Sequence, residues 1–376
     1  MIKALAGLAA LAVAMGIGRF AFTPVLPMML QDAGLSIASG GLLASANYLG
    51  YLIGALSAMV VRIQPERAIR GGLLVIGIVT LAMAAALPFG AWLALRLIAG
   101  LASAWVLISV SAWCLGALAA YQRPFLNSLV FAGVGTGIAT AGLLCIALID
   151  MAAGSSDAWV ALGLLSLVVC ALVWRLFTPH AAPSGTGAPA ARERHRWDAQ
   201  SVRLVCCYGV FGFGYIIPAT FLPVMAKAEL QGSSLFAWSW PVFGLAAALS
   251  TLAVAALVRR MGNRRLWVIC HFIMAVGIIL PVVTPGLPAI FAAAIGVGGT
   301  FMVITLAALQ EAKRVAARSG TVMMAAMTAA FATGQIIGPL TLSAGSSDFS
   351  SGLIVAAVLL AASGIALMKK ETPPHS

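Results

Sequence analysis

Apolar runs long enough to cross a bilayer recur along the whole chain and limit what it can fold into. Of its 376 residues, 62% are apolar and 9% are charged, whereas a soluble domain has about 25% charged residues. A transmembrane helix needs roughly 20 consecutive, mostly apolar residues. The sequence therefore predicts an all-α integral membrane protein with twelve transmembrane helices. The predicted segments are 4–30, 36–61, 71–88, 91–118, 125–149, 158–177, 201–226, 233–258, 266–284, 288–310, 320–343 and 349–368.

The net charge of +12 follows from where Lys and Arg stand, not from a patch that could bind nucleic acid. These residues concentrate at the N-terminus and in every second loop, while the loops of the opposite side hold only Lys227. The positive-inside rule then predicts that both termini are cytoplasmic. We expect a multi-pass protein surrounded by the lipid bilayer, monomeric and without a nucleic-acid partner.

The first segment contains an unusual stretch, GIGRFAFTPVLP at residues 16–27. Arg19 is the only charged residue within 4–30, and an arginine near a helix centre costs roughly 2.5 to 3.5 kcal/mol on insertion scales. Pro24 and Pro27 cannot donate a backbone N–H, so the carbonyls four residues before them are expected to be free near the guanidinium. This stretch is typical of a functional site within a membrane helix.

A second intramembrane cation, Arg96, begins the pattern RLIAGLASA in the fourth segment. It could line a pathway for a solute. It lies only a few residues inside the predicted outer end, however, so it could instead extend to the membrane interface.

The opening stretch recurs in the seventh segment as GFGYIIPATFLP, residues 212–223. Equivalent residues are separated by 196 positions, as in Gly16 and Gly212 or Pro27 and Pro223. Such a parallel repeat predicts two pseudo-symmetric six-helix bundles, residues 1–177 and 201–376, joined by a cytoplasmic linker at 178–200. The intramembrane arginines belong to the first half alone.

These features predict a site in which Arg19 anchors an anionic group of a small-molecule substrate. On a regular helix, Phe22, Thr23 and Leu26 would share the face of Arg19 and supply an aromatic wall, a hydroxyl and an apolar floor. The alternative is that Arg19 is a structural clamp on backbone carbonyls. The substrate-pathway candidates are Arg19, Phe22, Thr23, Asn47, Tyr51, Arg96, Tyr215 and Gln335. The candidates for helix kinks or hinges are Gly16, Gly18, Pro24, Pro27, Gly212, Gly214, Pro218, Pro223, Gly338 and Pro339.

Catalytic and metal chemistry is not predicted. The six cysteines all fall in apolar segments, without His or carboxylates at ligand spacing, so we expect no metal and no cofactor. No Asp or Glu lies within the twelve predicted segments, and His271, expected to be a satisfied interfacial residue, is the main candidate for handling a proton. This favours exchange or facilitated movement, and the membrane potential contributes about 2.3 kcal/mol per 100 mV to the export of a monovalent anion.

The motifs GIGRFAFTPVLP, ANYLGYLIGA, RLIAGLASAW, FAGVGTGI, GFGYIIPATFLP and GQIIGPL stand in order along the chain. Together they resemble the YbfB/YjiJ-type subfamily of the major facilitator superfamily. The resemblance implies a secondary carrier of the bacterial inner membrane that works by alternating access, with a cavity lined mainly by the first, fourth, seventh and tenth segments. We expect no enzymatic activity, because the segments offer no nucleophile, metal cluster or carboxylate pair. The second, fifth, eighth and eleventh segments would complete the interface. The loop RIQPERAIR lacks the acidic residue usual in the superfamily. Proton-coupled uptake, drug efflux and a transport-inactive sensor remain alternatives.

Overall fold

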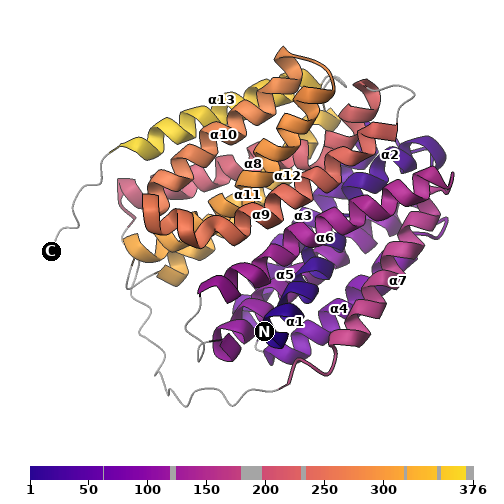
Figure 1. Cartoon of the computed structure of the whole chain (residues 1–376), viewed down its shortest axis with the longest axis horizontal. Coiled ribbons are helices and arrows are strands. Elements are labelled where there is room, and N and C mark those ends of the chain that lie inside the picture. The colour runs from indigo at the N-terminus through magenta and orange to yellow at the C-terminus, as the bar shows by residue number, and fades with distance from the viewer. Residues whose placement is uncertain are drawn as a thin grey trace.

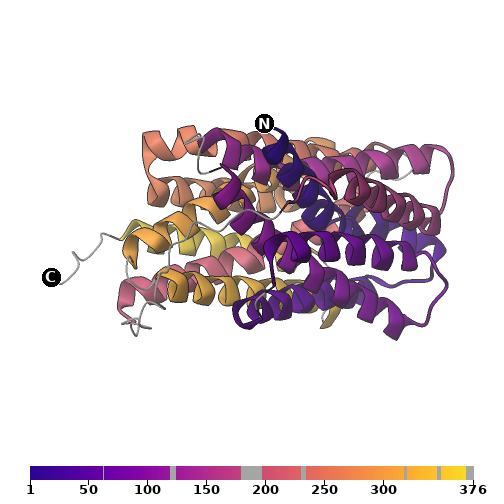
Figure 2. The same ribbon diagram turned by 90° about the horizontal axis from the view of Figure 1, so that it is seen from below.

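A computed structural model describes residues 1–61, 63–118, 124–178, 197–229, 234–316, 320–344 and 349–369. Within these ranges every regular element is a helix, and most helices run roughly along one common direction (Figures 1 and 2). The elements are α1 (Ile2–Leu11), η1 (Ala12–Ile17), α2 (Phe22–Asp32), α3 (Ile37–Val60), α4 (Pro65–Ala82), α5 (Phe89–Leu118), α6 (Pro124–Asp150), α7 (Ser155–Val173), α8 (Ala199–Glu229), η3 (Ser234–Trp238), α9 (Ser239–Met261), α10 (Asn263–Val283), α11 (Leu287–Val315), α12 (Gly320–Ala344) and α13 (Phe349–Met368).

Eleven helical stretches of the described residues are long and apolar enough to cross a membrane, the first of them comprising α1, η1 and α2. The predicted third segment, 71–88, differs most from the structure. Its helix, α4, starts earlier and includes Glu66, Arg67 and Arg70, and it ends at Ala82. Because of these charges, α4 is not among the eleven candidate membrane-spanning stretches. The bounds predicted for this segment were wrong, since the helix runs from Pro65 to Ala82.

Among the described residues, three pairs of α-helices, besides a smaller contact of η3 with α6, make the main contacts between the part of the chain before residue 178 and the part after residue 197. These are α3 with α12, α6 with α9, and α2 with α8 (Figure 1). The first two pairs correspond to the second, fifth, eighth and eleventh segments, which the family resemblance implies for the interface. Most of the predicted linker lies at 179–196, outside the described residues.

Contacts between α2 and α8 repeat the offset found in the sequence. Thr23 Oγ1 donates to the carbonyl of Ala219 at 2.7 Å, and Lys227 Nζ donates to Gln31 Oε1 at 2.8 Å. Both pairs are separated by 196 positions. Equivalent positions of a two-fold repeat can touch one another only next to the symmetry axis. The sequence repeat is thus matched by direct contacts in space.

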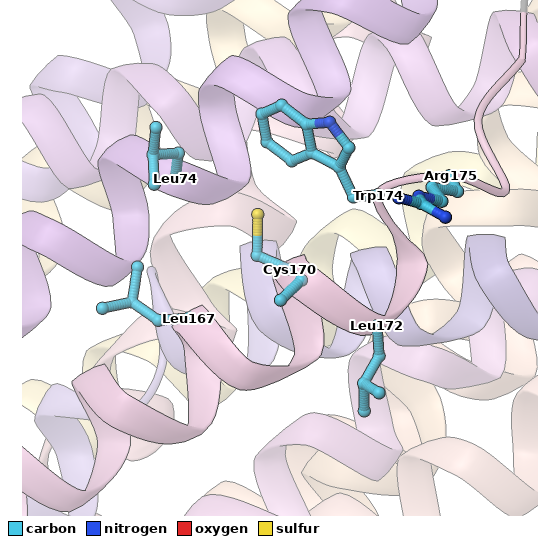
Figure 3. A pocket seen from close by; sticks show the side chains of 7 residues that line it. Leu74, Leu167, Cys170, Leu172, Trp174 and Arg175 are labelled. Atoms are coloured by element: carbon cyan, nitrogen blue, oxygen red, sulfur yellow. The ribbon is translucent and has the colours of Figure 1, made fainter.

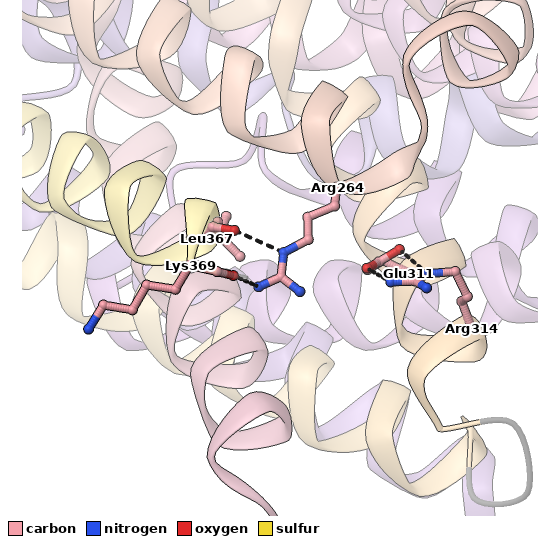
Figure 4. Close-up of polar contacts among 5 residues, drawn as sticks. All are labelled: Arg264, Glu311, Arg314, Leu367 and Lys369. Carbon is pink, nitrogen blue, oxygen red and sulfur yellow. Dashed lines mark hydrogen bonds and ion pairs between the residues drawn. The ribbon is translucent and has the colours of Figure 1, made fainter. Parts of the chain in front are cut away.

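An arginine near the start of a helix holds the end of a neighbouring helix in two places. Arg70 of α4 donates through Nε to the carbonyl of Trp174 after α7, at 2.9 Å. Arg264 of α10 donates to the carbonyls of Leu367 and Lys369 at the end of α13, at 2.9 and 3.2 Å (Figure 4). A guanidinium suits this position because the last carbonyls of a helix have no intrahelical donor and carry partial negative charge.

Glycines allow the closest helix crossings. A Cβ added to Gly100 of α5 would meet the carbonyl of Asn47 and lie 3.0 Å from the backbone nitrogen of Tyr51 in α3. Across the junction of α6 and α9, a Cβ on Gly135 would lie 2.6 Å from the carbonyl oxygen of Gly244. Small residues of this kind let helix backbones approach within a membrane, where van der Waals packing drives association.

We expect Gly100→Ala to lower the thermal stability of the purified protein, because its methyl group would overpack the crossing at a cost of about 1–3 kcal/mol. Gly90→Ala, in the same helix with nothing within 4 Å of the added carbon, is the control and should leave the melting temperature nearly unchanged. Equal melting temperatures for the two variants would contradict the close crossing.

Candidate functional site

The helix that carries Arg19 is irregular around it. The predicted continuous helix over 4–30 is wrong, because α1 passes into the π-helix η1, and a turn at residues 18–21 separates η1 from α2. Backbone bonds here span five residues, from Gly18 N to Val13 O at 2.8 Å and from Phe20 N to Met15 O at 3.1 Å. A π-bulge of this kind is frequent at functional sites. It changes the directions in which the following side chains point.

Arg96 and Asn47 bind the backbone of this turn. Arg96 donates to the carbonyls of Arg19 at 3.1 Å and Gly18 at 3.5 Å. Asn47 Nδ2 donates to the carbonyl of Gly18 at 3.2 Å and to that of Arg96 at 2.9 Å. Arg96 is only 3% exposed, so it does not extend to an interface. The clamp role considered for Arg19 is therefore performed by Arg96.

The carbonyl of Phe20 is not available to Arg19 as expected. It accepts a bond from the backbone nitrogen of Thr23 at 3.1 Å, because the turn closes over three residues there. The prediction that this carbonyl would be free for the guanidinium was wrong.

Arg19 itself extends across the junction between the two parts of the chain. Its Nη2 donates to Gln335 Oε1 of α12, and Gln335 Nε2 donates to the hydroxyl of Tyr215 in α8. The guanidinium carbon lies 3.9 Å from the ring centroid of Tyr51 and 5.3 Å from that of Tyr48. Arg19 is 2% exposed and its Nε has no hydrogen-bond partner among the described residues. Three of the predicted pathway residues, Arg19, Gln335 and Tyr215, thus form one network, and a fourth, Tyr51, lies next to it.

Phe22 and Thr23 do not form the wall predicted beside Arg19. Phe22 stacks on Trp159 of α7 at 6.5 Å and lies beneath the guanidinium of Arg96 at 4.9 Å. Thr23 donates to α8. The prediction assumed a regular helix, and the turn at residues 18–21 removes that spacing. The rings beside Arg19 belong instead to Phe20, Tyr48 and Tyr51.

Tyr48 was absent from the predicted site, as were the aromatic residues of α8, α11 and α12 other than Tyr215. Tyr48 follows Asn47 directly, and its hydroxyl lies 3.0 Å from Thr220 Oγ1. Phe301 was noticeable in the sequence only as the repeat partner of Trp105. Apolar aromatic residues are so common in membrane helices that their type alone gives no signal.

The predicted kink and hinge residues lie at helix contacts or inside helices. A Cβ on Gly16 would meet the backbone of Gly137, and one on Gly18 would lie 2.7 Å from Ser103 Oγ. Gly212 faces the backbone of Phe331. Gly214 and Gly338 face the side chains of Leu360 and Ile216, at 2.6 and 2.5 Å from an added Cβ. Pro24 and Pro27 stand in α2, Pro218 and Pro223 in α8, and Pro339 in α12.

Two titratable groups differ from what the sequence led us to expect. His271 is 0% exposed, with Nδ1 3.2 Å from the carbonyl of Trp267 and Nε2 lacking a partner among the described residues, so it is not a satisfied interfacial histidine. The helix α11 continues beyond the predicted span and includes Glu311, 1% exposed. Glu311 is paired with Arg314 at 2.8 Å (Figure 4). This buried carboxylate lies one residue beyond the predicted segment 288–310 and was not considered in the prediction.

Other sites are poorer candidates. A surface groove between α4 and α7 is lined by Leu74, Leu167, Cys170, Ala171, Leu172, Trp174 and Arg175 (Figure 3). It offers one charged side chain and apolar walls, without a convergent polar group. Among the described residues, no cluster of His, Cys, Asp or Glu could hold a metal ion.

Among the described residues, the cation buried between the two parts of this polytopic helical protein has no counter-charge, which suits a membrane transporter. The chain belongs to the family described as "Uncharacterised MFS-type transporter YbfB", whose model matches residues 11–369. It is thus a transporter of the major facilitator superfamily, as the sequence motifs predicted.

Solved structures agree with this fold. The nucleoside transporter NupG matches with a TM-score of 0.73 over 99% of this chain and 100% of NupG, at 14% sequence identity. A single-site mutant of NupG matches with the same TM-score over 98% of this chain and 100% of its own, at 17% identity. Likeness at these identities shows the fold alone. No curated protein matches the chain by sequence.

We expect Arg96→Lys to destabilise the protein, because lysine keeps the charge but loses the planar fork that binds two carbonyls. Each buried carbonyl left unpaired costs about 1–3 kcal/mol. The melting temperature should fall, and backbone amides of residues 18–23 should exchange hydrogen faster. The control Arg175→Lys, exposed on the surface groove, should change neither. An unaltered melting temperature in Arg96→Lys would show that the clamp is not needed.

Proposed function

We propose that this transporter is a secondary carrier that moves a small anionic organic solute across the bacterial inner membrane by alternating access. The observation that carries the proposal is the neutral partner of Arg19. Among the described residues, neither Arg19 nor Arg96 forms an ion pair, and the guanidinium of Arg19 instead binds the amide oxygen of Gln335. Within the site, this amide oxygen stands where a carboxylate oxygen of the substrate would bind.

The charge of the site favours exchange of that amide for an anion. A hydrogen bond from a guanidinium to a carboxylate is roughly twice as strong as one between neutral groups. Arg19 has already lost its contact with water, because it is 2% exposed. The carboxylate alone must therefore be desolvated when it binds. Arg19 also has a spare Nε donor, which suits a bidentate anion.

The carrier would operate by rocking of two six-helix halves, residues 1–177 and 201–376, about the axis between α2 and α8. The contacts of Thr23 with Ala219 and of Gln31 with Lys227 support this axis, since each joins repeat-equivalent positions. With cytoplasmic termini, these contacts lie toward the outer side. They would close that side in the present conformation and break when the site opens outward.

The network of Arg19, Gln335 and Tyr215 couples the site to this movement. Arg19 belongs to the first half, whereas Gln335 and Tyr215 belong to the second. A substrate that replaces Gln335 on Arg19 changes the contact between the halves at the point where they separate. An anion carried without a proton is driven outward by a potential that is negative inside. We therefore propose export or exchange as its direction.

The test begins with a thermal-shift screen of the purified protein against anionic, neutral and cationic metabolites, since a ligand of the folded state raises its stability. We expect anionic hits. Arg19→Lys should then weaken their binding at least about tenfold, because it loses a charge-assisted bond of about 1.5–3 kcal/mol. Arg19→Ala should abolish transport in proteoliposomes and leave the protein monodisperse.

The control for these variants is Arg265→Lys, an exposed arginine at the start of α10, which should bind and transport normally. If Arg19→Ala lowers expression and melting temperature while the surviving protein binds the hits with unchanged affinity, Arg19 is a structural residue. The anion proposal would then be wrong.

A further inference from the structure

Aromatic rings surround the buried cation from both parts of the chain. From the first part, Phe20, Tyr48 and Tyr51 have their ring centroids 5.4, 5.3 and 3.9 Å from the guanidinium carbon of Arg19. From the second part, Tyr215 reaches the same network through Gln335. The site therefore combines one fixed positive charge with extended ring surfaces.

The rings around Tyr215 are nearly parallel. Tyr215 lies 5.6 Å from Phe301 of α11 with an interplanar angle of 4°, and 5.6 Å from Phe331 of α12 with an angle of 9°. Phe211, one turn earlier on α8, stacks on Tyr215 at 5.1 Å and 26°. Aromatic side chains also meet edge to face in proteins, so several near-parallel rings on one residue define a stacking surface.

Tyr215 shows what kind of molecule this surface accepts. It presents a planar ring to Phe301 and Phe331, and its oxygen is joined to Arg19 by a single bridging amide. A free planar ring bearing a carboxylate could make both contacts at once. It would need the Gln335 bridge to withdraw, as the carrier proposal requires, and the ring of Tyr215 to leave Phe301 and Phe331.

The surroundings of the cation differ from the helix crossings. The closest helix crossings of this protein use glycine, as at Gly100 and Gly244. At the cation, by contrast, several large rings converge, and Trp240 lies 6.5 Å from Phe20 with its indole N–H buried and without a partner among the described residues. A buried donor of this kind suits a polar ring substituent of a bound molecule.

We infer that the substrate class of this site is a planar aromatic carboxylate. The inference rests on the proposed carrier function and deepens it. The carboxylate binds the guanidinium of Arg19 in place of Gln335, and the ring stacks on the faces of Phe301 and Phe331 that Tyr215 now covers. Rings stacked in this way favour an aromatic ligand over a saturated ligand of the same size.

The experiment compares three matched pairs of acids as ligands of the purified full-length protein. They are benzoate with cyclohexanecarboxylate, phenylacetate with cyclohexylacetate, and 3-phenylpropionate with 3-cyclohexylpropionate, and benzamide serves as a neutral aromatic probe. Dissociation constants come from thermal shifts over a concentration series. The saturated acids are the more hydrophobic, so non-specific partition into detergent would favour them.

We expect at least one aromatic acid to bind about 3- to 10-fold more tightly than its saturated partner, in line with the strength of aromatic stacking. Phe301→Leu should remove this preference, because it weakens binding of the aromatic acid more than binding of its saturated partner. Phe331→Leu provides a second variant if the first does not fold. The control Phe177→Leu, a buried ring packed on Trp113, should keep the preference.

The outcomes separate this inference from the carrier proposal. If both acids of every pair bind with equal affinity and Arg19→Lys abolishes their binding, the aromatic preference is overturned and the anion site is supported. Binding of benzamide as tight as that of benzoate, and insensitive to Arg19→Lys, would overturn the anion site. Failure of all six acids to bind would overturn both.

Discussion

The buried guanidinium of Arg19 is the constraint on which the central part of this structure depends. A cation in the hydrocarbon region needs partners that do not come from water. Here its partner is a neutral amide from the opposite part of the chain, flanked by the rings of Tyr48 and Tyr51. The charge therefore joins the two parts and remains without a counter-charge among the described residues.

The second arginine makes this position possible. Because η1 is a π-helix, the turn after it leaves the carbonyls of Gly18 and Arg19 to side chains, and Arg96 and Asn47 bind them. Arg19 and Arg96 therefore have different roles, although in the sequence both are simply arginines within apolar segments. Arg96 binds the backbone and stabilises the turn, whereas the side chain of Arg19 is directed across the junction to Gln335.

Much of the fold could be predicted because it follows from hydrophobicity and repetition. The apolar runs predict the helices. The offset of 196 residues reappears in the contacts of Thr23 with Ala219 and of Gln31 with Lys227. The site was predicted only in part. Arg19, Gln335 and Tyr215 were marked by polarity within apolar segments, but Phe22 was misplaced because a π-helix has no clear sequence signal. The buried carboxylate of Glu311 was missed because α11 continues past its apolar run.

The most direct test of this account is the melting temperature and ligand affinity of Gln335→Glu. A carboxylate at this position would neutralise Arg19 from within, and the hydroxyl of Tyr215 could donate to it. We predict a higher melting temperature than wild type together with loss of binding of anionic ligands, whereas Gln335→Met should lower the melting temperature. A Gln335→Glu protein that binds anionic ligands as tightly as wild type would contradict the account, because substrate and residue 335 could not then compete for Arg19.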